Sequence, residues 1–284
     1  MDKLKVSFLD FWPEIKDENI FLPILQKYFD VEVIENNPDV IIHSFFGTTH
    51  LSPQYKCKKI LFIGENYRAA QYGSDYSISF DPPTDKNFRL PLWQFYLILR
   101  PELQKILFGP RIQHESFDKF CFFIVSNPNN FMRNGAFQSL NSYKRVHSYG
   151  KFMTNDLSLQ QATQGRYWRD VKYEFLLKNK HKFGITYEHS PYPYYCTEKL
   201  MDAFLAGSMP IYWGDPKIKE DWNIDAFINV MRYTGWMDEI KRIDTHKEYF
   251  DQYYNRPIFT DEQKQRHLSN IENFESWLID VIKK

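Results

Sequence analysis

The sequence predicts an α/β protein with two Rossmann-like domains that face each other across a cleft. Short apolar runs of strand length alternate with stretches of helical periodicity, a pattern typical of a parallel sheet covered by helices. The chain has 284 residues, enough for two domains of ordinary size. A mixed polar stretch at 104–118 contains Gly109-Pro110 and indicates a linker, with a domain boundary near residue 115.

The first domain, residues 1–115, contains a helix among several strands. The apolar run from Val6 to Leu9 predicts a buried strand, and Asn19 to Phe29 has apolar residues at helical spacing. Pro23 falls early in that helix, where proline is best tolerated. Three further strands are expected at 31–34, 40–43 and 60–63.

The second domain, residues 116–260, starts with a strand from Phe120 that leads through a polar turn into a helix at 131–140. Apolar runs at 182–187 and 209–213 predict two more strands. The last segment, 261–284, is expected to be one amphipathic helix packed on a domain. Its apolar face would consist of Ile271, Phe274, Trp277, Leu278 and Val281.

Charge and cysteine content exclude several classes of protein. Lys plus Arg and Asp plus Glu both number 36, which argues against a general nucleic-acid binder. The three cysteines show no paired spacing, so neither a disulfide framework nor a zinc site is expected. Cys121 lies in an apolar run and is expected to be buried, whereas Cys196 is expected to be more accessible. Aromatic residues make up 18% of the chain; they suit the C–H faces of sugars but also fill cores.

The stretch from Tyr187 to Asp215 reads as a polar aromatic loop, a short helix and a strand. Thr197 is a good helix N-cap, and Glu198 suits the positive end of the helix. Free backbone N–H groups and Lys199 could hold the diphosphate of a nucleotide there. By spacing alone, an ordinary capped αβ unit is the simpler interpretation.

The block TEKLMDAFLAGSMPIYWGDP, at 197–216, resembles the donor-binding signature of the α-1,3/4-fucosyltransferases, glycosyltransferase family 10. Three other segments resemble family segments in the same order: FIGEN at 62–66, DYSISFD at 75–81 followed by RLP, and VSNPN at 125–129 followed by Arg133-Asn134. The resemblance covers about residues 58 to 230. It implies the GT-B fold and an inverting fucosyltransferase that moves L-fucose from GDP-fucose to a glycan, with O3 of GlcNAc in an N-acetyllactosamine-type acceptor as the expected hydroxyl.

Glu65 is the candidate general base. It follows an apolar strand and Gly64, at a strand end where ligand sites of α/β proteins gather. Partial burial there would raise its pKa toward a useful value. The resemblance indicates the same residue, although a carboxylate that only caps the next turn would fit the sequence too.

The remaining candidates would bind the donor. Arg133 and Lys199 are expected to stabilise the leaving diphosphate, and the alternative for both is a solvated charge on a helix. Glu198 could bind the ribose or stabilise charge on the sugar, and Tyr195 matches a family tyrosine at the donor site. His189 stands where the family usually has Asn, which leaves the donor contact from that position open.

No essential cofactor or metal is expected. The chain has no Asp-x-Asp pair, no HExxH and no glycine-rich nucleotide loop, so a divalent ion is expected to be stimulatory at most. Neither a signal peptide nor a transmembrane segment is indicated, and we expect a cytoplasmic protein of bacterial or viral origin. Two alternatives stay open: a GT-B transferase for another nucleotide sugar, and a catalytically silent glycan-binding protein.

Overall fold

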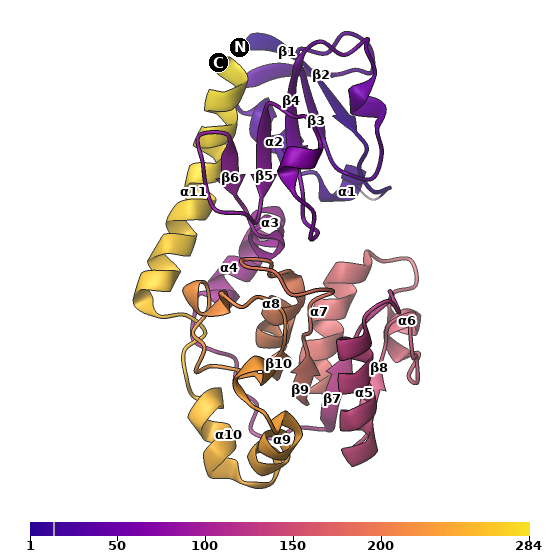
Figure 1. Cartoon of the computed structure of the whole chain (residues 1–284), viewed down its shortest axis with the longest axis vertical. Helices are drawn as coiled ribbons and strands as arrows, with labels where there is room; N and C mark the ends of the chain where they lie inside the picture. Colours follow the sequence, from indigo (N-terminus) through magenta and orange to yellow (C-terminus); the bar gives the residue numbers. More distant parts are fainter. Residues whose placement is uncertain (14) are drawn as a thin grey trace. The chain divides into compact units, whose positions relative to one another are not determined.

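The computed structural model describes residues 1–13 and 15–284, which form two compact units (Figure 1). The first unit comprises Met1–Pro101 together with Gln265–Lys284, and the second comprises Glu102–Lys264. Each unit has its own parallel sheet with helices packed on it. The predicted α/β class with two Rossmann-like domains is therefore confirmed.

The sheet of the first unit has six parallel strands in the order β2-β1-β3-β4-β5-β6. Their bounds are β1 Asp2–Leu9, β2 Phe29–Val33, β3 Val40–His43, β4 Lys58–Phe62, β5 Tyr76–Ser79 and β6 Asn87–Arg89. The four strands predicted here are confirmed with small shifts at their ends, because apolar runs such as 40–43 are buried completely. Strands β5 and β6 were not predicted, since polar residues interrupt their apolar pattern.

The C-terminal helix α11 (Asp261–Lys283) packs on the first unit and runs along its sheet (Figure 1). The rings of Phe274 and Trp277 each lie 5.3 Å from that of Phe88 on β6, and His267 hydrogen-bonds Gln94. The predicted helix is thus confirmed. The other helical elements of this unit are α1 Ile15–Glu18, α2 Phe21–Gln26, α3 Leu92–Leu99, η1 Thr49–Leu51 and η2 Ala69–Gln71.

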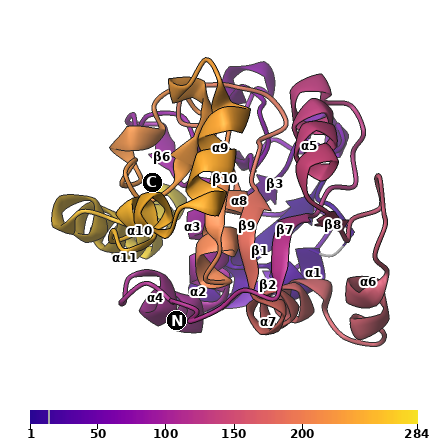
Figure 2. The same ribbon diagram turned by 90° about the horizontal axis from the view of Figure 1, so that it is seen from below.

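The sheet of the second unit has five parallel strands in the order β11-β10-β9-β7-β8. These are β7 Lys119–Phe123, β8 Val146–Ser148, β9 His181–Ile185, β10 Met209–Tyr212 and β11 Ile228–Asn229. Figure 2 shows α5 and α9 on one side of the strands and α7 on the other. The helical elements are α5 Phe131–Tyr143, α6 Ser158–Ala162, α7 Trp168–Asn179, α8 Glu198–Leu205, α9 Trp236–Thr245, α10 Lys247–Tyr254, η3 Ile218–Glu220 and η4 Val230–Arg232.

The units divide at a different place from the predicted boundary near residue 115. Helix α4 (Pro101–Leu107) occupies part of the expected linker. Beyond it, Arg111 Nη1 donates to the carbonyl oxygens of Ala226, at 2.8 Å, and Tyr253, at 3.0 Å, while a ring nitrogen of His114 lies 2.9 Å from the carbonyl oxygen of Ala206. These bonds hold the segment on the second unit. Arg111 and His114 are half-buried by these bonds, and local sequence does not distinguish such residues from those of a solvated linker.

Among the helices in the described ranges, none combines the length and the apolar character that crossing a lipid bilayer requires.

Candidate active site

In each unit the predicted site residues lie where parallel strands end, the edge at which α/β folds bind ligands. In the second unit, three connections meet at this edge. They follow β7, β9 and β10, and they carry Asn130, Glu188 and Gly214 respectively. A Cβ at Gly214 would lie 2.6 Å from Cγ of Glu188, so only glycine allows β10 to approach that carboxylate.

Glu188 organises the start of α8. Its side chain is fully buried; Oε1 accepts from the backbone N–H of Thr197 at 2.8 Å, and Oε2 accepts from the Thr197 hydroxyl at 2.7 Å. Lys199 Nζ lies 3.1 Å from the same Oε2. Burial raises the pKa of Glu188, while the charge of Lys199 and the two Thr197 bonds oppose that rise. Glu188 therefore fixes the Lys199 ammonium beside the first turn of α8.

Thr197 stands at the N-cap position but does not cap with its side chain, so that part of the prediction is wrong. Its hydroxyl instead donates to Glu188 and accepts from Lys199 Nζ at 2.7 Å. A buried carboxylate is a stronger acceptor for the hydroxyl than water is, and the hydroxyl then faces away from the helix amides.

Asn130 links α5 to the same network. Its Oδ1 caps α5 by accepting from the backbone N–H of Arg133 at 2.8 Å, and its Nδ2 donates to the backbone oxygens of Glu188 and His189. Arg133 is only 3% exposed, and its Nη2 donates to the carbonyl oxygen of Asn127 at 2.6 Å. The interpretation of Arg133 as a solvated helix charge is therefore wrong. The structure brings Arg133, His189 and Lys199 together through Asn130 and Glu188.

Neither Asn130 nor Glu188 was identified as a site residue from the sequence. Asn130 is 58 residues from Glu188, so their hydrogen bond depends on how β7 and β9 pair. One signal was present: Glu188 is an acidic residue that directly follows an apolar strand. That signal alone does not distinguish a buried organising carboxylate from a solvated one.

Glu198 is half-buried at the first position of α8 and lies among cations. Burial raises its pKa, but the charges of Lys199, Arg169 and Lys172 outweigh burial and hold that pKa well below its usual range. Lys172 also forms an ion pair with Asp202, one turn further along α8. The start of α8 is thus a concentration of fixed positive charge that keeps Glu198 ionised.

Tyr195 is 1% exposed, as is its neighbour Cys196, so the expectation that Cys196 is accessible is wrong. Burial raises the pKa of the Cys196 thiol well above its usual value. The chain turns just before them at Tyr194, whose φ of +67° is left-handed and whose N–H donates to Asp215 Oδ1 at 2.7 Å. Cys121 is buried as predicted, and all three cysteines are free.

Glu65 follows β4 in the first unit and is exposed, so the expected partial burial is wrong. Its backbone oxygen accepts from the N–H of Tyr67 at 2.7 Å, which makes a tight turn at the strand end. An aromatic cluster lies next to this turn: the ring of the exposed Tyr67 is 4.7 Å from that of the half-buried Phe45, which stacks on the exposed Phe46 at 4.2 Å. Glu65 is therefore accessible to a substrate, and it lies next to an apolar surface.

Asp10, His43 and His50 bring possible metal-ligand atoms within 4.8 Å of one another in the first unit. The two imidazoles stack at 3.7 Å with planes 14° apart, so their in-plane lone pairs do not converge on one point. His50 Nδ1 is 2.6 Å from Asp10 Oδ2, and both ring nitrogens of His43 are hydrogen-bonded, to Ser44 and Ser74. A metal ion here would have to displace these bonds.

Comparison with known proteins shows the family and the fold of the chain. The model of the α-(1,3)-fucosyltransferase FucT N-terminal domain matches residues 6–96, and that of the glycosyltransferase family 10 (fucosyltransferase) C-terminal region matches residues 115–273. A crystal structure of an α1,3-fucosyltransferase with GDP-fucose superposes with a TM-score of 0.71 at 22% identity, covering 100% of this chain and 92% of that one. At this identity the superposition establishes the GT-B fold.

Two curated relatives illustrate the range of the similarity. The α-(1,3)-fucosyltransferase FucT of Helicobacter pylori is 26% identical over 94% of this chain. A GDP-fucose protein O-fucosyltransferase 3 of Xenopus laevis is 29% identical over 47% of it. The chain spans 63% of the length of the first and 29% of the second.

Proposed function

Because the chain belongs to glycosyltransferase family 10, the fucosyltransferase family, we propose that it transfers L-fucose from GDP-fucose to a hydroxyl of a glycan acceptor, with inversion at the anomeric carbon. The observation that carries the proposal is the network at the end of β9. There Glu188 holds Lys199 beside the start of α8, and Asn130 ties the same segment to Arg133. Such an array of fixed cations suits a departing diphosphate.

In this proposal the second unit binds the donor. Arg133 and Lys199 contact the diphosphate oxygens, and the first turn of α8 adds its positive helix end. Glu198, kept ionised by the surrounding cations, accepts from ribose hydroxyls or stabilises positive charge on the fucose. We assign His189, which is half-buried, to the donor side, and Tyr195 to the layer beneath it, because only 1% of Tyr195 is exposed. His189 supplies one hydrogen bond where an amide could supply two.

The first unit supplies the base. Glu65 accepts the proton of the acceptor hydroxyl while that oxygen bonds to the anomeric carbon of fucose. The bond from this carbon to the β-phosphate oxygen breaks on the opposite side, and GDP leaves with the electron pair. The exposure of Glu65 is compatible with this role, because the base has to contact a substrate that enters from solvent.

We propose O3 of GlcNAc in an N-acetyllactosamine-type glycan as the acceptor group. The name of the Xenopus relative, a protein O-fucosyltransferase, indicates a different acceptor for that protein. We also propose that no metal is essential. The charges of Lys199, Arg169 and Lys172 act on Glu198 at the start of α8, and together with Arg133 they would stabilise the leaving diphosphate in place of a divalent ion.

The test combines donor binding with product analysis. GDP should raise the thermal midpoint of the protein more than UDP at equal concentration, because a ligand specific for the native state stabilises it by mass action. Incubation with labelled GDP-fucose and N-acetyllactosamine should give a fucosylated trisaccharide whose linkage and anomeric configuration NMR determines. Equal shifts with both nucleotides would contradict the donor, and a shift without any transfer would favour the glycan-binding alternative.

A further inference from the structure

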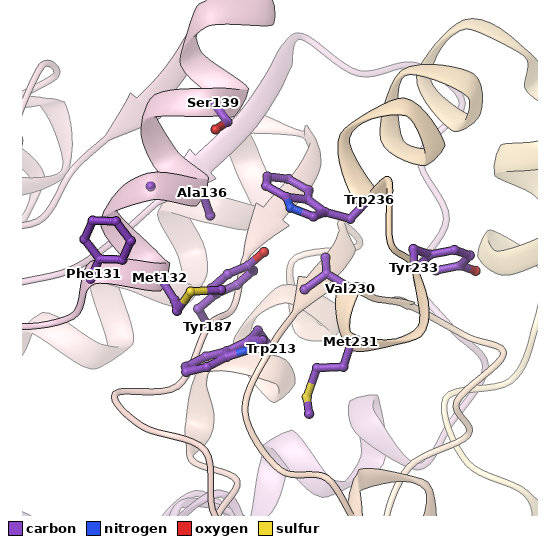
Figure 3. Close-up of a pocket in the computed structure, with 11 residues that line it drawn as sticks. Phe131, Met132, Ala136, Ser139, Tyr187, Trp213, Val230, Met231, Tyr233 and Trp236 are labelled. Atoms are coloured by element: carbon purple, nitrogen blue, oxygen red, sulfur yellow. The ribbon is translucent and has the colours of Figure 1, made fainter.

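The second unit contains a pocket of about 380 Å³ between α5 and the segment from η4 to the start of α9 (Figure 3). Its α5 wall includes Met132, Gly135 and Ala136, and Trp236 stands on the other side. Tyr187 and Trp213, which follow β9 and β10, lie between these walls. Volumes of this size are typical of ligand pockets.

None of the proposed donor residues lines this pocket. Tyr187 and Glu188 are successive residues in an extended segment that continues the ladder of β9, so their side chains point to opposite faces of the sheet. Glu188 faces α8 and Lys199, whereas Tyr187 joins the apolar core under α5 and α9. A diphosphate held by Lys199 and a ligand in the pocket would therefore lie on different sides of the strand end.

The lining favours a neutral ligand with hydroxyl groups. None of the lining residues is charged, so a phosphate or carboxylate finds no counter-ion there. The rings of Tyr187 and Trp213 are 5.9 Å apart with planes 29° from parallel, and such aromatic faces pack well against the C–H faces of a sugar. The lining also lacks carboxylate and amide side chains, the groups that usually recognise the polar edge of a nucleobase.

The hydroxyl of Tyr187 offers a hydrogen bond to a ligand in the pocket. The side chain is 2% exposed, and no hydrogen bond of this hydroxyl occurs within the described part of the chain. Burial raises the pKa of the phenol, so it stays protonated and can both donate and accept. The hydroxyl is not among the fully buried polar atoms that lack a partner, so water reaches it through the pocket, and a ligand hydroxyl could replace that water.

Gly135 leaves open space on the α5 wall of the pocket. A glycine inside a helix costs about 1 kcal/mol relative to alanine. A Cβ at Gly135 would meet no atom within 4 Å, so packing does not require the missing side chain. The glycine instead leaves room over a helix face that also carries the small Ala136.

We propose that this pocket binds a sugar of the acceptor glycan other than the one that receives fucose. The inference rests on the proposed function, because a glycan is the neutral, hydroxyl-rich substrate of that reaction. Tyr187 would hydrogen-bond one of its hydroxyls, with Trp213 and Trp236 packing against its C–H surface. The second unit would then select for acceptor length as well as bind the donor.

The test fills the pocket from its open wall. Gly135→Leu should remove the space without disturbing existing contacts, and Gly135→Ala is the matched control that adds only a methyl group. The acceptors are N-acetyllactosamine and its linear tetrasaccharide of two such units. We expect the wild type and Gly135→Ala to use the tetrasaccharide with a KM at least about tenfold lower, a difference of roughly 1.4 kcal/mol. Gly135→Leu should lose this preference and keep the wild-type KM for GDP-fucose.

Two measurements separate this proposal from the proposed function. Saturation-transfer NMR reports tetrasaccharide binding directly, and the GDP-induced thermal shift reports an intact donor site. Loss of tetrasaccharide binding in Gly135→Leu with an unchanged GDP shift supports the pocket assignment even if no transfer is detected in the wild type. An unchanged tetrasaccharide preference or affinity in that variant overturns it, as does a selective loss of GDP binding, which would make the cavity part of the donor site.

Tyr187→Phe provides a finer test, since it removes only the hydroxyl. We expect about a tenfold weaker binding of the tetrasaccharide, the effect of one lost hydrogen bond to a neutral partner, with unchanged binding of the disaccharide. If binding of the disaccharide weakened as much as binding of the tetrasaccharide, Tyr187 would not contact a sugar other than the one that receives fucose.

Discussion

The strand ends of the two sheets carry opposite kinds of surface. In the second unit, Arg133 and Glu188 are buried and bonded into one network with Lys199. In the first unit, Glu65 is exposed and its neighbours Phe46 and Tyr67 are 56% and 47% exposed. One edge is a buried network of charged groups, whereas the other carries an exposed carboxylate beside exposed aromatic rings.

This difference corresponds to two chemical tasks. A leaving diphosphate needs cations whose positions do not change during the reaction, because reorganisation would cost part of their stabilisation. A base that serves a variable, neutral acceptor needs access and adaptable surface instead. The same type of sheet therefore supports both tasks, and the residues after the strands decide which one each unit performs.

Glu65→Gln tests the edge of the first unit and should have the largest effect. Glutamine keeps the shape but accepts no proton, so kcat should fall by roughly 10²–10⁴. The KM for GDP-fucose should stay near the wild-type value, because the residue acts on the acceptor. Steady-state kinetics with both substrates varied provides the measurement, and turnover close to that of the wild type would show that another group is the base.

Arg133→Ala and Lys199→Ala test the edge of the second unit. Each removes one charge-assisted contact to the diphosphate, worth about 2–4 kcal/mol of transition-state stabilisation. In contrast to Glu65→Gln, both should also weaken the affinity for GDP, measured by calorimetry. If both variants kept the wild-type affinity for GDP and the wild-type turnover, the strand ends of the second unit would not be the site that binds the diphosphate.

Acidification should reveal a property that the units share. Burial lowers the pKa of His43, in the first unit, to about 4 and that of His181, in the second, to about 3, from 6.5. The unfolded chain therefore binds more protons below pH 6.5, and stability falls as the pH falls. At pH 5 each histidine should cost about 2 kcal/mol relative to pH 7.

Urea unfolding at several pH values measures this loss. Single His43→Gln and His181→Gln variants should each flatten the slope between pH 6.5 and pH 5. A slope that neither variant changes would mean that other groups control the acid sensitivity.

Glu188→Gln tests whether the charge of Glu188 holds Lys199 in position, and its effect on activity should be smaller. The amide retains hydrogen bonds to Thr197 but loses its charge attraction to Lys199. We expect kcat/KM to fall about tenfold, equivalent to about 1.4 kcal/mol. Thr197→Ser keeps the hydroxyl and is the control. If Glu188→Gln matched the wild type while Lys199→Ala was impaired, Lys199 would not depend on Glu188 for its position.

Chelation should have the smallest effect. With fixed cations at the donor edge, activity in excess EDTA should remain within about twofold of the untreated rate, because one missing stabilising contact would already cost far more. The assay uses protein purified with EDTA and then dialysed. Complete loss of activity that manganese restores would place a metal where we assign Arg133 and Lys199.

Prediction from sequence succeeded where the signal was local. Runs such as 40–43 and 209–213 are apolar and of strand length, and both became central strands. It failed where a residue's environment is assembled from distant segments. Cys196 follows a polar aromatic loop and was expected to be accessible, yet folding places it in the interior. The segment around Arg111 resembles a linker until its hydrogen bonds to residues 226 and 253 are known.

The sequence by itself determined the α/β class, the order of the family segments and the residue types available for transfer. Hydrophobic periodicity and short motifs encode these properties within about ten neighbouring residues. Only the tertiary structure decided that Glu188 holds Lys199, that Asn130 joins β7 to β9, and that Tyr187 lines a pocket opposite the donor residues. These arrangements depend on strand pairing and on which face each side chain takes, and a register shift of one residue would exchange Tyr187 and Glu188.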